Sequence, residues 1–269
     1  MKRLLYTILL VAAFWYISKF SIVLAIIIGL ALMAFILWSR RASILTQMAS
    51  QAYFVRGDEE KALKNYKTAY KTGIMTSDCK VSFAAFCLYT DRFESCRKLL
   101  DQVSNSMRST EIDVANAKHY LAILEWKEGN LDEAIILMEK VHKDYPSTGT
   151  YGSLGAFYIE KAKRDNCFED YLDFMLEAYD YNDSDKTIVD NLGELYLNLK
   201  DYEKAEEVYS KLLEKNQISP VPYYNYALVL KELGKKDEAK ENLEKALNCT
   251  FTRSLVVSED MVKKELENL

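Results

Sequence analysis

The 269-residue sequence is poor in the residues that interrupt regular structure, with three prolines and nine glycines. An all-β fold needs a turn about every 8–12 residues, so this scarcity excludes that class. It also excludes collagen-like chains and disordered chains rich in proline and glycine. Aromatic residues are plentiful, with 19 tyrosines and 11 phenylalanines, which supply ample material for a core.

Histidine is also scarce, and the residues that usually bind metals are not spaced as ligands. The two histidines are His119 and His142, and no His-x-x-x-His or Cys-x-x-Cys spacing occurs. A zinc site needs a cluster of such side chains, so we expect neither a metal nor another cofactor. The five cysteines are odd in number and show no disulfide-framework pattern, which favours a reducing compartment.

Two patterns that resemble catalytic motifs lack the context that catalysis requires. Gly149, Gly152 and Gly155 form a Gly-x-x-Gly-x-x-Gly string without a preceding strand pattern or a following Gly-Lys-Ser/Thr sequence. The string instead predicts a helix start and a close contact between helices at Gly155. Paired acids such as Asp132-Glu133 lie where helices open, and carboxylates there favour the positive end of the helix dipole. We therefore expect a protein that is not an enzyme.

Acidic residues are missing from the start of the chain. Residues 1–41, the head, contain five basic and no acidic residues and therefore carry +5. Because the whole chain carries −5, residues 42–269, the body, carry −10. Nucleic acids are bound through clustered lysine and arginine, so the acidic body argues against a nucleic-acid partner.

The head contains two apolar runs, residues 4–17 and 20–38, which predict a transmembrane helical hairpin in the segment 1–41. The second run would be about 28 Å long as a helix, which matches the hydrocarbon thickness of a bilayer. The chain would then contact lipid through residues 4–38. Two alternatives stay open: only the second run spans while the first lies in the interface or extends the helix, or residues 1–17 are a cleaved signal peptide.

The basic residues of the head predict its orientation. A hairpin places Lys2, Arg3, Arg40 and Arg41 on one side of the membrane and only Lys19 on the other. By the positive-inside rule both ends of the chain, and with them the body, lie in the cytoplasm. The head offers only half of a Gly-x-x-x-Gly motif, so homo-oligomerisation stays open without support.

The body is an internal repeat. Residues 186–219 align without a gap on residues 220–253, and Ala205 falls on Ala239, so the period is 34 residues. This pattern resembles the tetratricopeptide repeat, a helix–turn–helix unit in which small residues let helix backbones approach. One unit cannot bury its apolar face alone, so neighbouring units must stack. Weaker or equal copies of the pattern occupy residues 43–76, 77–110, 115–148 and 148–185.

The resemblance implies an all-α protein, an α-solenoid of about six repeats over residues 43–253. The fourth copy needs about four extra residues near Lys163–Phe168 to keep the register. Residues 254–269 contain an amphipathic stretch and predict a C-terminal capping helix, which repeat arrays need for solubility.

The resemblance also implies a concave groove lined by the first helix of each repeat, where a protein or peptide ligand binds. It places there Gln47, Gln51, His119, Tyr120, Ile123, Trp126, Asp190, Asn191, Glu194, Tyr224, Asn225 and Lys231. Some family members clamp a C-terminal carboxylate with lysine at position 5 and asparagine at position 9, and no repeat here has that pair. An open alternative is that several of these side chains, Tyr120 and Trp126 especially, pack between helices instead.

These features predict a membrane-anchored scaffold or adaptor that binds a protein or peptide partner at the cytoplasmic face of the cell membrane. Two alternatives keep the same array. In the first, the array lies outside the cytoplasm and assists envelope assembly. In the second, the chain is a non-catalytic regulatory subunit of a membrane enzyme. The sequence does not identify the partner.

Overall fold

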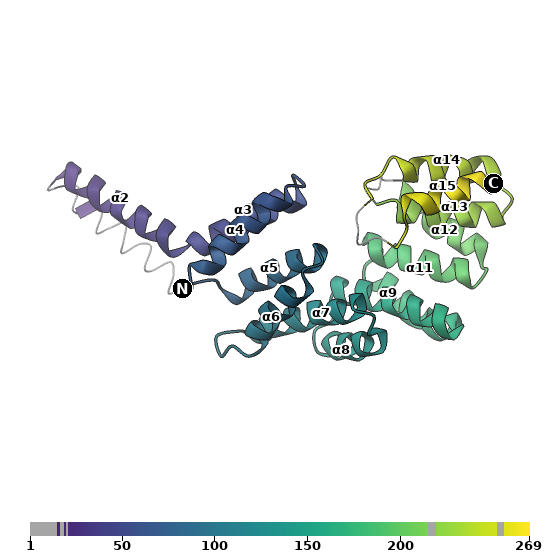
Figure 1. Cartoon of the computed structure of the whole chain (residues 1–269), viewed down its shortest axis with the longest axis horizontal. Coiled ribbons are helices and arrows are strands. Elements are labelled where there is room, and N and C mark those ends of the chain that lie inside the picture. The colour runs from purple at the N-terminus through teal and green to yellow at the C-terminus, as the bar shows by residue number, and fades with distance from the viewer. Residues whose placement is uncertain (1–14, 17–18, 20, 215–218, 252–255) are drawn as a thin grey trace. The chain divides into compact units, whose positions relative to one another are not determined.

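The computed structural model describes residues 15–16, 19, 21–214, 219–251 and 256–269. These residues form helices joined by short turns and contain no strand (Figure 1). The predicted all-α class is therefore confirmed. The chain divides into two compact units, residues 1–86 and residues 87–269.

The first unit begins with the apolar helix α2, Ile22–Ser39. The hydroxyl of Ser21 caps it by accepting a hydrogen bond from the backbone N–H of Leu24 at 3.2 Å. Its large side chains are exposed, Leu30 at 60%, for example. Among the described residues it is the one helix whose length and composition would let it cross a membrane. The other helix of the predicted hairpin, 4–17, lies outside the described residues except for Trp15 and Tyr16, so the described head holds one apolar helix.

The rest of the first unit is a helix pair followed by most of a third helix. Helix α3 is Arg41–Phe54, α4 is Glu59–Lys71 and α5 is Ser77–Tyr89, which crosses the boundary between the units. Helices α3 and α4 pack closely because small residues meet between them, with Ala49 and Ala62 fully buried. The ring of Tyr66 on α4 stacks on Phe83 of α5 at 4.8 Å between ring centroids.

The second unit continues the same helix–turn–helix pattern. Its helices are α6 (Phe93–Ser104), α7 (Glu111–Lys127), α8 (Leu131–Asp144), α9 (Thr148–Asp165), α10 (Leu172–Tyr181), α11 (Lys186–Asn198), α12 (Tyr202–Leu213), α13 (Val221–Glu232), α14 (Lys236–Leu247) and α15 (Glu259–Glu267), with the short 3₁₀ helix η1 (Phe168–Tyr171) before α10. The first helices of successive pairs touch one another, α7 with α9, α9 with α11 and α11 with α13. This stacking makes the second unit an α-solenoid.

Residues that are 34 positions apart in the sequence contact each other in the structure. His119 lies 3.3 Å from Ser153 between Nε2 and Oγ, and these residues are 34 apart. The indole N–H of Trp126 donates to Oε2 of Glu160 at 2.5 Å, again 34 residues on. A side chain on one first helix therefore meets the same position on the next first helix.

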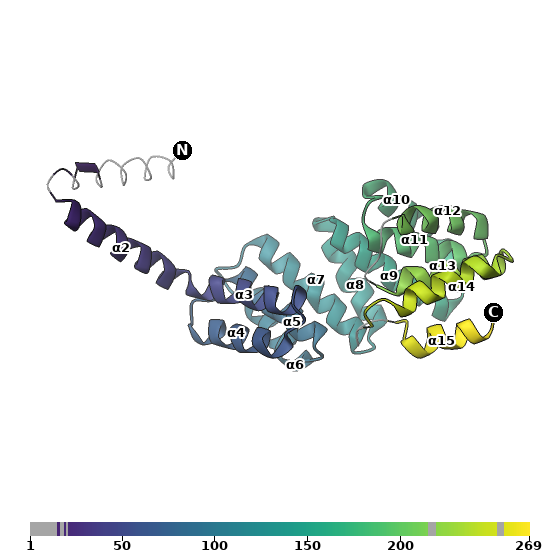
Figure 2. The ribbon, with the colours of Figure 1, turned by 90° about the horizontal axis from the view of Figure 1, so that it is seen from above.

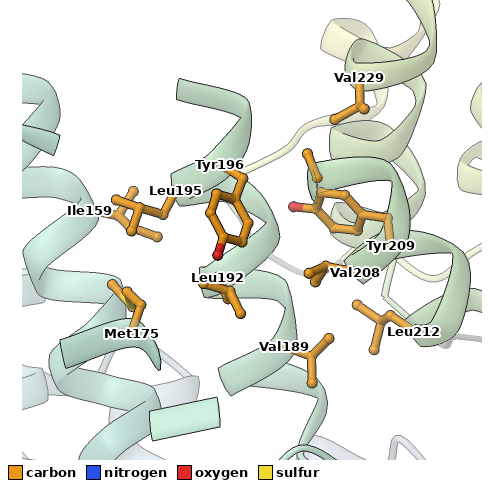
Figure 3. Close-up of a cluster of buried hydrophobic side chains, with 11 residues drawn as sticks. Ile159, Met175, Val189, Leu192, Leu195, Tyr196, Val208, Tyr209, Leu212 and Val229 are labelled. Atoms are coloured by element: carbon orange, nitrogen blue, oxygen red, sulfur yellow. The ribbon is translucent and has the colours of Figure 1, made fainter. Parts of the chain in front are cut away.

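A buried apolar cluster joins the fourth and fifth helix pairs to the sixth (Figure 3). Leu192, Leu195 and Tyr196 of α11 lie at its centre, with Tyr209 of α12 beside them. Gly193 makes this approach possible: a Cβ atom at Gly193 would lie 2.7 Å from the ring of Tyr209. The small residue of the repeat pattern therefore has a direct steric role here.

Helix α15 closes the C-terminal end of the unit and lies beside α14 (Figure 2). Its Val262 is fully buried in a cluster with Leu243 of α14, and Leu266 packs against the same cluster. Glu265 of α15 forms an ion pair with Lys231 of α13, 34 residues earlier. By this spacing α15 occupies the place that the first helix of a further repeat would take.

Candidate partner-binding groove

The second unit contains a groove of about 320 Å³, which we call the central groove. Its walls come from α7, α9, α11 and α13 and from residues before and in α15. It is lined by Trp126, Ala156, Ile159, Glu160, Lys163, Asn191, Glu194, Leu197, Asn198, Val221, Tyr224, Asn225, Leu228, Val256, Val257 and Met261. The lining is mainly apolar, with a few polar groups, which is the usual character of a ligand site.

Two aromatic side chains, Trp126 of α7 and Tyr224 of α13, contribute to the walls, and both are partly buried. The Trp126 ring packs on Phe157 with 5.5 Å between ring centroids, and its N–H is held by Glu160. Trp126 therefore both packs between helices and lines the groove, so the two interpretations from the sequence are compatible. The pKa of Tyr224 is raised, first because it is partly buried and then because Glu265 is near.

Among the described residues, the groove lining contains more acidic than basic side chains. Glu160 and Glu194 line the groove together with one cation, Lys163. The Lys163 ammonium lies 2.5 Å from Oε1 of Glu194, and 45% of the lysine side chain is exposed. Glu160 is held by the neutral indole of Trp126. One carboxylate charge of the lining is therefore not matched by a lining cation.

A third carboxyl group, Asp190, lies beside the groove on α11. Nδ2 of Asn225 approaches its Oδ1 at 3.5 Å, and the hydroxyl of Tyr209 donates to its main-chain carbonyl oxygen at 3.2 Å. Burial, and then the negative charge of Glu194, raise the pKa of Asp190 to about 7. The hydrogen bonds and Lys163 oppose that rise without cancelling it. A group that changes charge near neutral pH thus adjoins the lining.

The two asparagines of the lining are buried and already hydrogen-bonded. Asn191 donates through Nδ2 to the carbonyl oxygen of Gly152 at 2.9 Å, which ties α11 to α9. Asn225 directs its Nδ2 group at Oδ1 of Asp190. Each amide keeps its carbonyl oxygen as an acceptor, so both residues position the groove and still present a polar atom.

The predicted residues His119 and Tyr120 lie on α7 with Trp126 but outside the lining that the described residues form. Their rings are 5.5 Å apart between centroids, and both are partly buried. Burial lowers the pKa of His119 to about 4, so its imidazole is neutral at physiological pH. The geometry suits a neutral histidine hydrogen-bonded to Ser153 between first helices.

The predicted residues Gln47 and Gln51 lie on α3 in the first unit, whereas the central groove is built by the second unit alone. Both glutamines are exposed, as are their apolar neighbours Ile44 and Met48. Trp126, Asn191, Glu194, Tyr224 and Asn225 are the predicted residues that the structure brings together in one lining.

The sequence interpretation missed Glu160 and Lys163 on α9, which supply much of the groove's charge. They belong to the fourth repeat, whose register is broken by extra residues. Counting 34 residues from Trp126 reaches Glu160 and would have found it.

No group of three or more metal-ligating side chains occurs in the part of the chain that the structure describes. The five cysteines form no disulfide bond with one another, and Cys87 and Cys96 are fully buried. Burial raises the pKa of Cys96 to about 12, so this thiol is a core side chain and not a nucleophile.

Comparisons with known proteins identify the repeat. Two sequence profiles described as tetratricopeptide repeat match, one over residues 117–148 and one over residues 188–216 and 222–248. The search of curated proteins gave no match.

Two examples come from the solved structures that are similar to the chain. TTC0263, a thermophilic TPR protein in Thermus thermophilus, has a TM-score of 0.57 at 16% identity, covering 72% of this chain and 98% of its own. Pseudomonas aeruginosa pilF has a TM-score of 0.59 at 12% identity, covering 86% of this chain and 99% of its own. At such identities the likeness establishes a shared fold.

Proposed function

This chain is a tetratricopeptide repeat protein, and on that premise we propose that it is a membrane-anchored scaffold that holds a segment of a partner protein in the central groove. The observation that carries the proposal is the groove itself, built by first helices of successive repeats and lined by aromatic, apolar and charged side chains. Mainly apolar clefts with a few fixed polar groups are suited to binding, and buried aromatic anchors supply most of the affinity in such sites.

Within this proposal Trp126, Glu194 and Tyr224 contact the partner directly, because they line the groove. Asn191 and Asn225 offer the acceptor atoms that their internal hydrogen bonds leave over. Recruitment follows without catalysis, since a tethered array raises the effective concentration of any partner on the same membrane.

The anchor in this proposal is α2, whose large apolar side chains are exposed along the helix. Arg40 and Arg41 follow it directly, and the guanidinium of Arg41 lies 4.4 Å from the centre of the Trp38 ring. An aromatic and basic boundary of this kind suits the headgroup layer. We place the body in the cytoplasm because the basic residues of the head favour that side.

Topology is tested with a reporter fused after Leu269 that is active on only one side of the membrane. Activity of a cytoplasmic reporter is the expected result. Activity of a reporter that works only outside would replace the proposed location with the extracytoplasmic one, and the array would then serve envelope assembly.

Partner binding is tested by placing a photo-reactive amino acid at Leu228 in the groove and irradiating intact cells. We expect one discrete cross-linked product, which disappears when Trp126 and Tyr224 are both changed to alanine. The control carries the photo-reactive group at Ile136 on α8, which is 59% exposed and outside the lining. The same product from both positions, or none from Leu228, would contradict the groove as the binding site.

A further inference from the structure

We infer that the central groove receives a lysine or arginine side chain of the partner segment, held by Glu160 and Glu194 and flanked by Trp126 and Tyr224. The inference rests on the proposed function and adds the chemistry of the ligand to it.

The first argument is the charge of the lining. Two glutamates and one lysine line the groove in the described residues, and that lysine is already paired with Glu194. Glu160 has the neutral Trp126 indole as its hydrogen-bond donor. The side chain of Glu194 is 20% exposed, so its carboxylate is only partly hydrated. Partly buried carboxylates attract a cation more strongly than exposed ones do, because water screens them less.

The second argument is the position of the aromatic rings. Trp126 and Tyr224 line the same groove as the two glutamates. The face of an aromatic ring attracts lysine and arginine, and tryptophan does so most strongly. An ammonium is already near one ring, since Nζ of Lys127 lies 6.0 Å from the centre of the Trp126 ring. Rings and carboxylates together form a site that is selective for cations.

The third argument is the state of Lys163, which occupies part of the site in the absence of a partner. Its side chain is 45% exposed and reaches Glu194 from the neighbouring first helix. Because the lysine side chain is half exposed, its ammonium can move into solvent when a guanidinium takes its place on Glu194. Arginine is the better competitor, because its planar fork can bind a carboxylate through two hydrogen bonds.

The same groups disfavour other ligands. A carboxylate or phosphate in the groove would face Glu160 and Glu194 with only Lys163 to balance it. The apolar lining residues, such as Ile159 and Leu228, favour apolar side chains on either side of the basic residue in the partner. The partner segment is therefore an apolar stretch of protein that contains a lysine or arginine.

The test uses the full chain with Trp15 and Trp38 changed to phenylalanine, because Trp126 is then the single tryptophan and reports on the groove directly. The protein, in mild detergent, is first used to select from a random dodecapeptide library. The tightest peptide is then synthesised in its selected form and with each lysine or arginine replaced by glutamine or citrulline. Trp126 fluorescence then measures the binding of each peptide to this parent protein and to two glutamate-to-glutamine double variants of it.

The variant Glu160→Gln/Glu194→Gln removes both carboxylates, and Glu133→Gln/Glu244→Gln is the matched control with the same change in charge outside the lining. Glu133 and Glu244 are exposed. Circular dichroism verifies that both variants keep their helix content. We expect selected peptides enriched in lysine or arginine, about tenfold weaker binding after neutral replacement, and a similar loss in Glu160→Gln/Glu194→Gln only. Binding of the neutral peptide should be unchanged in both variants.

The outcomes separate the two ideas. Peptides that alter Trp126 fluorescence without any enrichment in basic residues would overturn the cation inference and leave the groove as the binding site. An equal loss of affinity in both double variants would also overturn it, because the effect would then come from total charge. The absence of any peptide that alters Trp126 fluorescence would count against the proposed function and the inference together.

Discussion

At the scale of single residues, the carboxyl group of Asp190 is the most perturbed acid near the groove. Burial and the charge of Glu194 raise its pKa to about 7, whereas an unfolded chain leaves aspartate with a pKa near 3.9. Between these two values the folded protein holds a proton that the unfolded chain has released. The free energy of unfolding therefore falls as the pH rises from about 4 to about 7, and this contribution changes no further above the folded pKa.

Asp190→Asn should remove this penalty. At pH 5 the folded side chain is still neutral, but the unfolded chain has already released its proton, so we expect the variant to melt at only a slightly higher temperature than the wild type. At pH 8.5 the wild type also carries the buried charge, and we expect a clearly larger difference in melting temperature in favour of the variant. Thermal unfolding followed by circular dichroism at both pH values measures the difference. A control change at the exposed Asp183, Asp183→Asn, should show the same small effect at both; a similar shift at both pH values for Asp190→Asn would contradict the assignment.

Gly193 shows how one small residue fixes the spacing of two helices. A methyl group there would lie 2.7 Å from the ring of Tyr209, which is fully buried and cannot move aside. In an open helix the change from glycine to alanine would gain about 1 kcal/mol, but overpacking costs about 1–3 kcal/mol or more.

We therefore expect Gly193→Ala to lower the free energy of unfolding by about 1–2 kcal/mol. Gly152→Ala is the matched comparison, since its methyl group would meet only Thr187 at 3.3 Å. Urea titrations of both variants give the values. A Gly193→Ala protein as stable as the wild type would mean that α11 and α12 can separate freely.

At the scale of elements, each turn between the two helices of a pair contains a residue with positive φ. Glycine supplies it at Gly57, Gly129 and Gly234, with φ values of 67°, 91° and 75°. Three pairs use other residues there, Asp91, Asn166 and Lys200, with φ values of 57°, 54° and 61°. A left-handed conformation costs a residue with a side chain about 1–2 kcal/mol, and asparagine tolerates it best.

Lys200→Gly should therefore stabilise the protein. Relief of the left-handed strain is partly offset by the greater freedom of glycine in the unfolded chain, so the expected gain is about 0.5–1 kcal/mol. Asn166→Gly, at the end of α9, should gain less because asparagine already suits this conformation. Chemical denaturation of both variants gives the comparison, and a loss of stability in Lys200→Gly would refute the argument.

The helices themselves could be predicted from the sequence because small and large residues recur every 34 positions. The fourth repeat was harder to place. Helix α9 runs for 18 residues to Asp165, and no glycine marks its end, so the following η1 left no clear signal. Glu160 of α9 precedes this irregular stretch and lies 34 residues after Trp126, so this groove residue could have been predicted from the period.

At the scale of the whole molecule, the division into a basic apolar head and an acidic body could be read directly from the order of residues. The groove could be predicted only in part. Which side chains line it depends on contacts between helices 34 residues apart, such as Trp126 with Glu160, and on residues after α14, such as Val257 and Met261. No local pattern in the sequence reports the path of that last segment against α13.

The last prediction concerns the anchor. Leu30 and Met33 lie near the middle of α2, and both are exposed. If α2 spans a bilayer, an arginine at the helix centre costs about 2.5–3.5 kcal/mol, so Leu30→Arg/Met33→Arg loses about 5–7 kcal/mol of insertion free energy. We expect the wild type to stay with the membrane pellet after alkaline carbonate extraction and the double variant to move to the supernatant. Ile136→Arg, which adds a positive charge at an exposed apolar position of α8, should stay in the pellet. Equal retention of all three proteins would show that α2 does not anchor the chain, and release of all three would show that the chain is not an integral membrane protein.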